Sequence, residues 1–434
     1  MKDRKIIIPW SVQKDTTLKK IDKTKGVYFW VKKKKFIDFC SQLVNINLGF
    51  QSPEVIKAII NQTKKLSFIG PKFENENRDK LAKILVNLYP GRMEKVFFSD
   101  SGARANEIAF IIAKHYTKKK KILARNVTSY HGATRYTASI SGDARRKMIN
   151  ASSADSLFFN DPIIYKCPTG KKYPNCQISK PEEIEKIFKK NQSIAAIIFE
   201  PITGSAGRIM PPKGYYETIR KLCNKYNVLL IFDEIMTGFG RTGKWFGANH
   251  WSAKPDIVTL AKGLTGGIMP LGATLISKKL SRFYDKEYFP TGLTNYGHPI
   301  ACAAGLAAVK AYKKNNLIKK SAHLGNIIEK RLNKLKRKFN CIGDIRGKGL
   351  FYAIEFVKDK NNKRLVNWTY KDYFKESQEM KNLFKYLSNK GLFCYGRYNM
   401  LYICPPLIIT KKELNNSLNI IEKGIFINIE QKFF

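Results

Sequence analysis

An apolar run that ends in two consecutive acids limits how this chain can fold. Residues 227–232 read Asn-Val-Leu-Leu-Ile-Phe, and Asp233 and Glu234 follow at once. A nearly continuous apolar strand is typical of a parallel sheet whose two faces are both covered. In open sheets of this kind, ligands bind at the carboxyl ends of the strands. The run therefore predicts a buried strand with Asp233 at its tip, facing a crevice.

Further apolar runs alternate with helical patterns, which is the arrangement expected when helices surround a parallel sheet. The strands predicted in this way are residues 193–199, 257–260 and 272–276, and a helix is predicted to begin near Gly214. The chain has 434 residues, of which 44% are hydrophobic, so it can bury a large core. These observations indicate an α/β protein.

Both ends of the chain follow a different pattern. Residues 26–30 and 35–39 predict two short antiparallel strands around a lysine-rich turn, and residues 352–356 predict a strand near the other end. We therefore expect a small α+β domain, built from both termini, beside the large α/β domain. The expected domain ranges are 1–74 and 316–434 for the two parts of the small domain, and 75–315 for the large domain.

The chain is strongly basic, with 79 lysines and arginines against 34 acidic residues and a net charge of +45. Such a charge attracts nucleic acids and anionic membranes. The lysines are spread over the whole chain, however, and no zinc finger or basic–aromatic repeat accompanies them. No apolar run approaches the ~20 residues that span a bilayer, and the N-terminus is not that of a secretory leader. We therefore expect a solvated basic surface, no specific nucleic-acid partner and no membrane segment.

The eight cysteines are scattered along the sequence. The closest pair, Cys167 and Cys176, has a spacing that suits neither a zinc site nor a redox motif. We therefore expect no metal site, reduced thiols and a cytoplasmic location.

Two further charged residues follow predicted strands. Glu200 comes directly after residues 193–199, and Lys262 follows residues 257–260 after a single alanine. Alone, an acid at a strand end is more simply a helix cap or the partner of a surface lysine, and a single lysine means little in a chain so rich in lysines. A lysine and two acids at three strand ends are a more specific combination. Residues 99–103, Ser-Asp-Ser-Gly-Ala, add the start of a helix, where free N–H groups and the helix dipole favour a phosphate.

A lysine, a buried acid and a phosphate cradle together suggest pyridoxal phosphate as the cofactor. The lysine would form a Schiff base with the aldehyde of the cofactor. The acid would pair with the pyridine nitrogen and keep it protonated, so that the ring accepts electrons from the substrate. We therefore predict that Lys262 is the Schiff-base residue and that Asp233 is the partner of the ring nitrogen.

The chain resembles the class III aminotransferases, which are pyridoxal-phosphate enzymes of fold type I. The resemblance covers nearly the whole chain and rests on segments in the order that the family has. These include FFSDSGARANEIA at 97–109, SYHGAT at 129–134, IFDEIMTGFGRTGKWF at 231–246, PDIVTLAKGLTGG at 255–267 and TNYGHPIACAAGLA at 294–307.

The resemblance implies a mostly parallel, seven-stranded sheet in the large domain and a set of site residues. Tyr130 would stack on one face of the cofactor ring and Ile235 would pack on the other. Lys262 would also carry the proton between the substrate carbon and the cofactor. Thr294 aligns with a threonine that reaches the phosphate of the neighbouring subunit, which implies a homodimer with shared active sites. The cofactor-binding positions are Ser101, Gly102, Ala103, Tyr130, His131, Glu200, Asp233, Ile235, Lys262 and Thr294.

A narrower resemblance concerns the substrate. The stretch Pro-Trp-Ser-Val-Gln at 9–13 and the tail Gly-Arg-Tyr-Asn-Met at 396–400 are similar to those of the taurine and ω-amino acid:pyruvate aminotransferases. This implies ping-pong transfer of an amino group from a taurine- or β-alanine-like donor to a 2-oxo acid, with pyruvate as the acceptor. Trp10 would then line the pocket, and Arg397 would bind a carboxylate or sulfonate.

Several alternatives remain open at the level of the sequence. Trp10 can equally belong to the core of the small domain, and Arg397 can be one more surface arginine. Within the family, the donor can be 4-aminobutyrate, ornithine or the substrate of the diamine-forming enzyme of the biotin pathway. From other classes, the chain can be a relative that has lost its chemistry, or a basic nucleic-acid binder.

Overall fold

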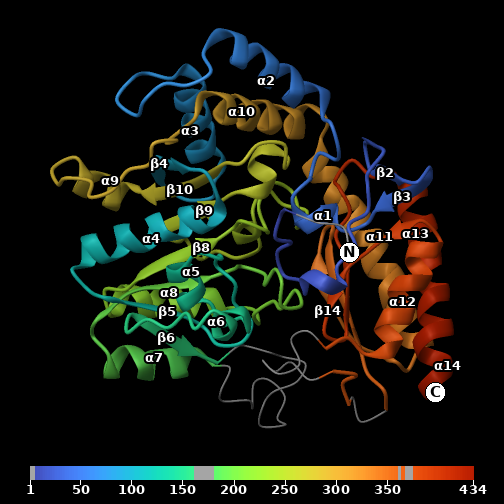
Figure 1. Ribbon diagram of the computed structural model, residues 1–434. Coiled ribbons are helices and arrows are strands. Elements are labelled where there is room, and N and C mark those ends of the chain that lie inside the picture. The colour runs from blue at the N-terminus through green and yellow to red at the C-terminus, as the bar shows by residue number, and fades with distance from the viewer. Residues whose placement is uncertain (1–4, 161–179, 360–362, 367–374) are drawn as a thin grey trace.

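The computed structural model describes residues 5–160, 180–359, 363–366 and 375–434 (Figure 1). Cys167 and Cys176 lie outside these residues. No helix in the described ranges combines the length and the apolar character that crossing a membrane requires.

A seven-stranded sheet forms the centre of the large domain, in the order β4-β10-β9-β8-β7-β5-β6. Strands β9, β8, β7, β5 and β6 run parallel, whereas β10 is antiparallel to both of its neighbours. The mostly parallel, seven-stranded sheet is therefore confirmed, and the four predicted strands agree with β7, β8, β9 and β10 to within two residues. The bounds are β4 (Met93–Ser99), β5 (Lys121–Arg125), β6 (Ser156–Phe159), β7 (Ile194–Phe199), β8 (Leu229–Asp233), β9 (Ile257–Leu260) and β10 (Gly272–Ser277).

Helices cover both faces of this sheet, and successive residues of one strand pack on different helices. On β8, Ile231 packs in one core cluster with Ile108 of α4, whereas Leu230 belongs to the cluster around Ile219 of α8. This two-sided burial accounts for the continuous apolar runs and leaves the strand ends as the place for polar residues. The helices are α3 (Glu76–Leu88), α4 (Gly102–Thr117), α5 (Arg135–Ile140), α6 (Arg145–Met148), α7 (Pro181–Lys190), α8 (Tyr215–Lys225), α9 (Lys278–Tyr284) and α10 (Pro299–Lys314).

The remaining strands form two four-stranded sheets, and one of them contains both ends of the chain. In the sheet β1-β2-β3-β13, Leu392 of β13 pairs in parallel with Ile37 of β3. The predicted antiparallel pair is β2 and β3, which are joined by a turn at Lys32 and Lys33. The other sheet has the order β11-β12-β15-β14. The bounds are β1 (Lys23–Lys25), β2 (Tyr28–Val31), β3 (Lys34–Asp38), β11 (Ile342–Lys348), β12 (Phe351–Phe356), β13 (Leu392–Phe393), β14 (Gly396–Arg397) and β15 (Met400–Ile403).

Long helices pack on these smaller sheets, on the side of the molecule where the C-terminus lies (Figure 1). They are α11 (Leu317–Lys338), α12 (Gln378–Asn389) and α13 (Lys411–Ile425). Helix α2 (Pro53–Lys65) belongs to the range predicted for the small domain, yet it packs against α10 at the far end of the large sheet (Figure 1). The domain boundaries near residues 74 and 315 stay a prediction.

Candidate active site

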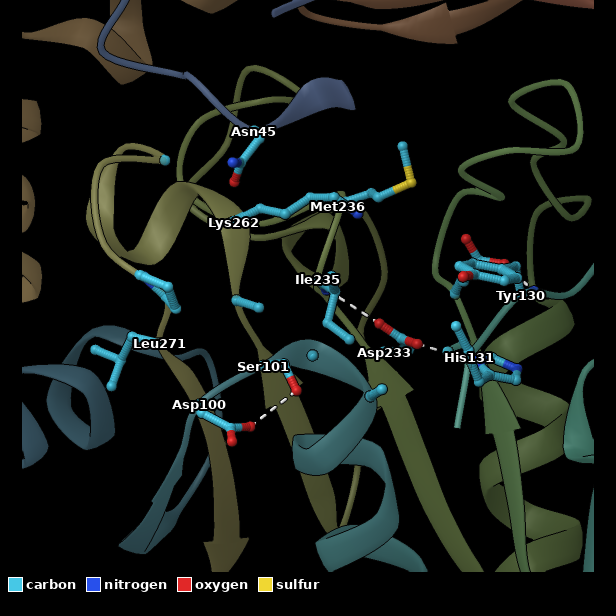
Figure 2. Close-up of a pocket in the computed structure, with 18 of the residues that line it drawn as sticks. Asn45, Asp100, Ser101, Tyr130, His131, Asp233, Ile235, Met236, Lys262 and Leu271 are labelled. Carbon is cyan, nitrogen blue, oxygen red and sulfur yellow. Dashed lines mark hydrogen bonds and ion pairs between the residues drawn. The ribbon is translucent and has the colours of Figure 1, made fainter. Parts of the chain in front are cut away.

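A cavity of about 620 Å³ opens at the carboxyl ends of the central strands. It lies where the sequence predicts a ligand, because β7, β8 and β9 end side by side there (Figure 2). The predicted residues that line it are Trp10, Ser101, Gly102, Ala103, Tyr130, His131, Glu200, Asp233, Ile235 and Lys262. Thr294 and Arg397 are not among the described residues that line it.

Lys262 begins a short 3-10 helix directly after β9 and its connecting alanine. Its φ of +46° lies in the left-handed region, which is uncommon and strained for a residue with a side chain. Burial lowers the pKa of the Lys262 ammonium, although the nearby carboxylates of Asp233 and Glu200 act in the opposite direction. The lysine is thus a better nucleophile than an exposed lysine at the same pH.

Asp233 is the last residue of β8, and its carboxylate is held by three donors. Oδ2 lies 2.9 Å from His131 Nδ1 and accepts a hydrogen bond of 2.8 Å from the Asn106 amide. Oδ1 accepts a hydrogen bond of 3.1 Å from the backbone N–H of Ile235 (Figure 2). These donors fix the direction of the carboxylate, as a partner for a ring nitrogen requires.

Asn106 is a site residue that the sequence reasoning missed. It is fully buried in α4, where its Nδ2 also donates to the His131 carbonyl at 2.7 Å. Its Oδ1 accepts a hydrogen bond of 2.7 Å from the Thr259 hydroxyl on β9. The sequence did carry a sign of this role, because Asn106 is a polar residue on the apolar face that includes Ala109.

The predicted phosphate cradle lies at the start of α4, and its role stays a prediction. Ser101 is the N-cap: its Oγ accepts a hydrogen bond from the backbone N–H of Arg104 and donates one to Asp100. A Cβ on Gly102 would lie 2.8 Å from Ile235 Cδ1, and a Cβ on Gly132 would lie 2.7 Å from Ala103 Cβ. At Gly132, where φ is +144° and the Ala103 backbone is also close, a side chain would be strained, whereas at Gly102 it would displace the end of the Ile235 side chain.

Glu200 follows β7 and holds the loop that carries Tyr130. Its Oε1 accepts a hydrogen bond of 3.1 Å from the backbone N–H of Tyr130, and its Oε2 accepts one of 2.7 Å from that of Gly204. Burial raises the pKa of the Glu200 carboxyl, and the negative charge of Asp233 adds to that effect while His131 opposes it. Its predicted part in binding the cofactor stays a prediction.

Two arginines near the cavity contact a single acid, Asp143. The Arg145 guanidinium lies 3.7 Å from the centre of the Tyr130 ring and 5.9 Å from that of Trp10. Arg397 does not line the cavity, but its Nη1 lies 2.6 Å from Asp143 Oδ2, and Asp143 also binds Arg145. The sequence reasoning missed Arg145 and Asp143, because nothing local distinguishes one arginine among so many basic residues.

The two remaining predictions concern Trp10 and Thr294. Trp10 lies at the cavity with 57% of its surface exposed, so it is not part of a core in the single chain. Thr294 is exposed in the segment between α9 and α10. Its predicted contact with a neighbouring subunit stays a prediction.

Comparisons with known proteins show the family of the chain. The family model described as "Aminotransferase class-III" matches residues 10–425. The chain is 33% identical over 420 residues to the taurine–pyruvate aminotransferase of Bilophila wadsworthia, covering 92% of this chain and 90% of that protein. It is equally 33% identical, over 414 residues, to a leucine/methionine racemase of Thermococcus litoralis, with 93% and 89% covered.

A solved structure shows the same fold at similar identity. The taurine:2-oxoglutarate aminotransferase from Bifidobacterium kashiwanohense, in complex with PLP and glutamate, matches with a TM-score of 0.91 and 34% identity, covering 99% of this chain and 96% of that one. An S-selective transaminase from Arthrobacter sp. with alanine bound matches with a TM-score of 0.89 and 25% identity, covering 98% and 96%.

The residues of the cavity fit pyridoxal phosphate, which is the cofactor of this enzyme. Asp233 would hold the ring nitrogen, the glycine-lined start of α4 would hold the phosphate, and Lys262 would hold the aldehyde carbon. When bound, the cofactor supplies an electron sink for the carbon next to the reacting nitrogen. The chain belongs to the class III aminotransferases, and it is a pyridoxal-phosphate enzyme of fold type I.

Proposed function

We propose that this enzyme takes an amino group from an ω-amino acid of the taurine or β-alanine type and gives it to a 2-oxo acid, with pyruvate as the acceptor. The proposal rests on one observation: Arg145 and Arg397 both bind Asp143, and the Arg145 guanidinium covers the ring of Tyr130, which lines the cavity that holds Lys262. An anionic group bound beside this ring leaves the amino end of a short substrate free to reach the lysine.

The residues of the chain divide the work in this proposal. Lys262, in its neutral form, takes the proton from the carbon that bears the nitrogen and returns one in the opposite half of the reaction. Asp233 keeps the ring nitrogen protonated. Tyr130 and Trp10 wall the cavity and exclude water from the reacting carbon.

Donor and acceptor use the same cavity in turn, so the kinetics are ping-pong. The donor has its anionic group far from the amine, whereas pyruvate has its carboxylate next to the reacting carbon. An arginine can bind both anions, because its planar guanidinium group presents N–H donors to either one. Its long side chain can also place that group at different distances from the reacting carbon. Arg397, on β14, is the arginine to which we assign this role.

The relatives differ in the acceptor that their names give. The Bilophila relative, a taurine–pyruvate aminotransferase, supports pyruvate, and the Bifidobacterium neighbour, a taurine:2-oxoglutarate aminotransferase, supports the alternative. The proposed reaction is tested against three alternatives. These are donors such as 4-aminobutyrate or ornithine, the diamine-forming reaction of the biotin pathway, and racemisation as in the Thermococcus relative.

We further infer a homodimer with shared active sites and a cytoplasmic location. Thr294 is exposed in the single chain, as a residue that reaches a neighbouring subunit must be. The six cysteines in the described part of the chain are free thiols, as in a reducing compartment.

The substitution Arg397→Ala tests the assignment of the anionic end. A charge-assisted contact is worth roughly 1.5–3 kcal/mol, so KM for taurine and β-alanine is expected to rise about ten- to a hundredfold. KM for an uncharged amine donor should change little. Arg337→Ala, which removes an exposed arginine from α11, is the matched control. Equal losses on charged and uncharged donors would show that Arg397 does not bind the anion.

A further inference from the structure

We propose that Asn45 is a specificity-determining residue, and that its side-chain amide donates a hydrogen bond to an oxygen of the anionic group of the substrate. This anionic group is a carboxylate or a sulfonate. The inference rests on the proposed function in one respect, because it needs a donor that is an acid. It does not depend on the role assigned to Arg397.

The side chain of Asn45 lies at the cavity that also contains Lys262 (Figure 2). It is half-buried, and its amide makes no hydrogen bond with any residue in the described part of the chain. The amide of Asn47, two residues later, is buried and donates to the Phe239 carbonyl at 3.2 Å. Asn47 is thus engaged by the fold, whereas the donors of Asn45 are available to a molecule in the cavity.

The backbone before Asn45 is strained. In α1 (Ser41–Val44), every residue except Leu43 has a φ between +48° and +56°, in the left-handed region that residues with side chains rarely adopt. Such strain persists only where surrounding contacts impose it. One of these contacts is made by the Asp38 carboxylate, whose Oδ2 accepts hydrogen bonds of 2.9 Å from the backbone N–H and from Nε2 of Gln42.

Buried contacts tie the chain on both sides of Asn45 to the loop that follows Asp233. The Arg241 guanidinium in this loop is fully buried, and its Nη2 donates to Ser41 Oγ at 3.0 Å and to Asn47 Oδ1 at 2.5 Å. Its Nη1 donates to two further backbone carbonyls, at 3.0 and 2.6 Å. The place of Asn45 relative to the end of β8 is therefore fixed by the fold.

The loop that follows Lys262 packs on the backbone of Asn45. A Cβ on Gly267, whose φ is +83°, would lie 2.9 Å from the backbone oxygen of Asn45. The loops after both Asp233 and Lys262 thus hold the segment that carries Asn45. A donor that is held in place before the substrate arrives binds it without a further ordering cost.

An amide at this place distinguishes acidic substrates from uncharged ones. Its N–H groups can donate to a carboxylate or sulfonate oxygen, and a hydrogen bond to a charged group is stronger than one between neutral groups. An uncharged amine of the same length leaves the amide without that partner. If Asn45 only shaped the cavity, its replacement would affect both kinds of substrate to a similar degree.

The half-reaction of the holoenzyme with a donor, in the absence of any acceptor, tests the proposal. Stopped-flow absorbance gives the dissociation constant and the limiting rate for β-alanine and for propylamine, which has the same carbon chain without the carboxylate. In Asn45→Leu, the dissociation constant for β-alanine is expected to rise about tenfold, as for the loss of a hydrogen bond to a charged group. The dissociation constant for propylamine and both limiting rates should change little.

Three further variants complete the experiment. Asn45→Gln keeps the donor and should recover part of the affinity for β-alanine. Asn45→Ala adds no bulk and should show the same difference between the two donors, so it replaces Asn45→Leu if the leucine variant does not fold. Asn224→Leu, which removes an exposed amide from α8, is the matched control.

Equal changes for β-alanine and propylamine, or no change for β-alanine, would overturn the proposal. If β-alanine does not react with the wild-type enzyme, 4-aminobutyrate and butylamine form the equivalent pair. A failure of the proposed donor is thereby distinguished from a failure of the role of Asn45.

Discussion

Asn106 donates a hydrogen bond of 2.8 Å to the carboxylate of Asp233, the acid at the tip of β8. The same amide reaches the His131 carbonyl, and its oxygen accepts from Thr259. Asp233 is therefore fixed by a helix, a loop and the neighbouring strand before any cofactor binds. Such preorganisation lets a carboxylate stabilise charge on the cofactor ring without having to move during the reaction.

Asp233→Asn removes the negative charge while it keeps the shape of the side chain. Without that charge the ring nitrogen loses its proton and the electron sink weakens, so kcat is expected to fall about 10²-fold or more. Steady-state kinetics at saturating cofactor measure this, with Asp285→Asn as the control for a change of surface charge. Turnover near that of the wild type would refute the role of Asp233.

Asn106→Ala removes the donor but leaves the acid in place. Asp233 Oδ2 and the Thr259 hydroxyl both lose a partner inside the protein. We expect the free energy of unfolding of the apoprotein to fall by about 1–3 kcal/mol, and kcat to fall less than in Asp233→Asn. Denaturant unfolding and steady-state kinetics measure the two effects, and an unchanged value of both would show that the Asn106 contact is incidental.

The pKa of Lys262 gives a pH dependence for cofactor uptake by the apoprotein. The neutral amine is the nucleophile, and burial lowers the pKa of Lys262 from 10.5. The uptake rate should therefore rise with pH and level off below pH 10.5. Asp233→Asn removes an acid that raises this pKa, so the plateau should begin at a still lower pH.

Stopped-flow absorbance follows the uptake, and borohydride reduction with peptide mapping identifies the lysine. Lys262→Ala should bind the cofactor without a covalent link and without turnover. A rate that keeps rising above pH 10.5 would contradict the effect of burial, and a label on a different lysine would contradict the assignment itself.

Thr294→Ala tests the shared active site. If the hydroxyl reaches the phosphate in a neighbouring subunit, the dissociation constant of the cofactor should rise roughly ten- to a hundredfold, as for a hydrogen bond to a charged group. Sedimentation should show a dimer, or a multiple of it, in both proteins. Thr291→Ala is the control in the same segment. A monomer that is loaded with cofactor and active would contradict the proposed dimer.

The sequence was sufficient for the parts of the site that lie at strand ends. Asp233 and Lys262 follow apolar runs that are buried on both sides, and this pattern alone places them at one edge of a parallel sheet. The helix at Ser101 was equally readable, because a capping serine and small residues precede an apolar helical face. These features are local, so the sequence shows them directly.

The contacts among Asp143, Arg145 and Arg397 could not be predicted in the same way. Asp143 and Arg397 are 254 residues apart and meet only because the strand β14 packs beside the loop before α6. Neither a hydrophobic periodicity nor a helix-cap motif in the sequence indicates such a contact. Arg397 and Trp10 were predicted through resemblance alone, and Asp143 and Arg145 not at all, since basic residues occur along the whole chain.

Transfer of labelled nitrogen from donor to acceptor distinguishes the proposed reaction from its alternatives. The holoenzyme is incubated with taurine or β-alanine that carries an isotopic nitrogen label, and with an equal mixture of pyruvate and 2-oxoglutarate, and the products are separated by mass spectrometry. We expect labelled alanine in large excess over labelled glutamate, and neither product with Lys262→Ala. Labelled glutamate as the main product would contradict pyruvate as the acceptor, and no transfer from either donor, with transfer from 4-aminobutyrate or ornithine instead, would contradict the proposed donor class.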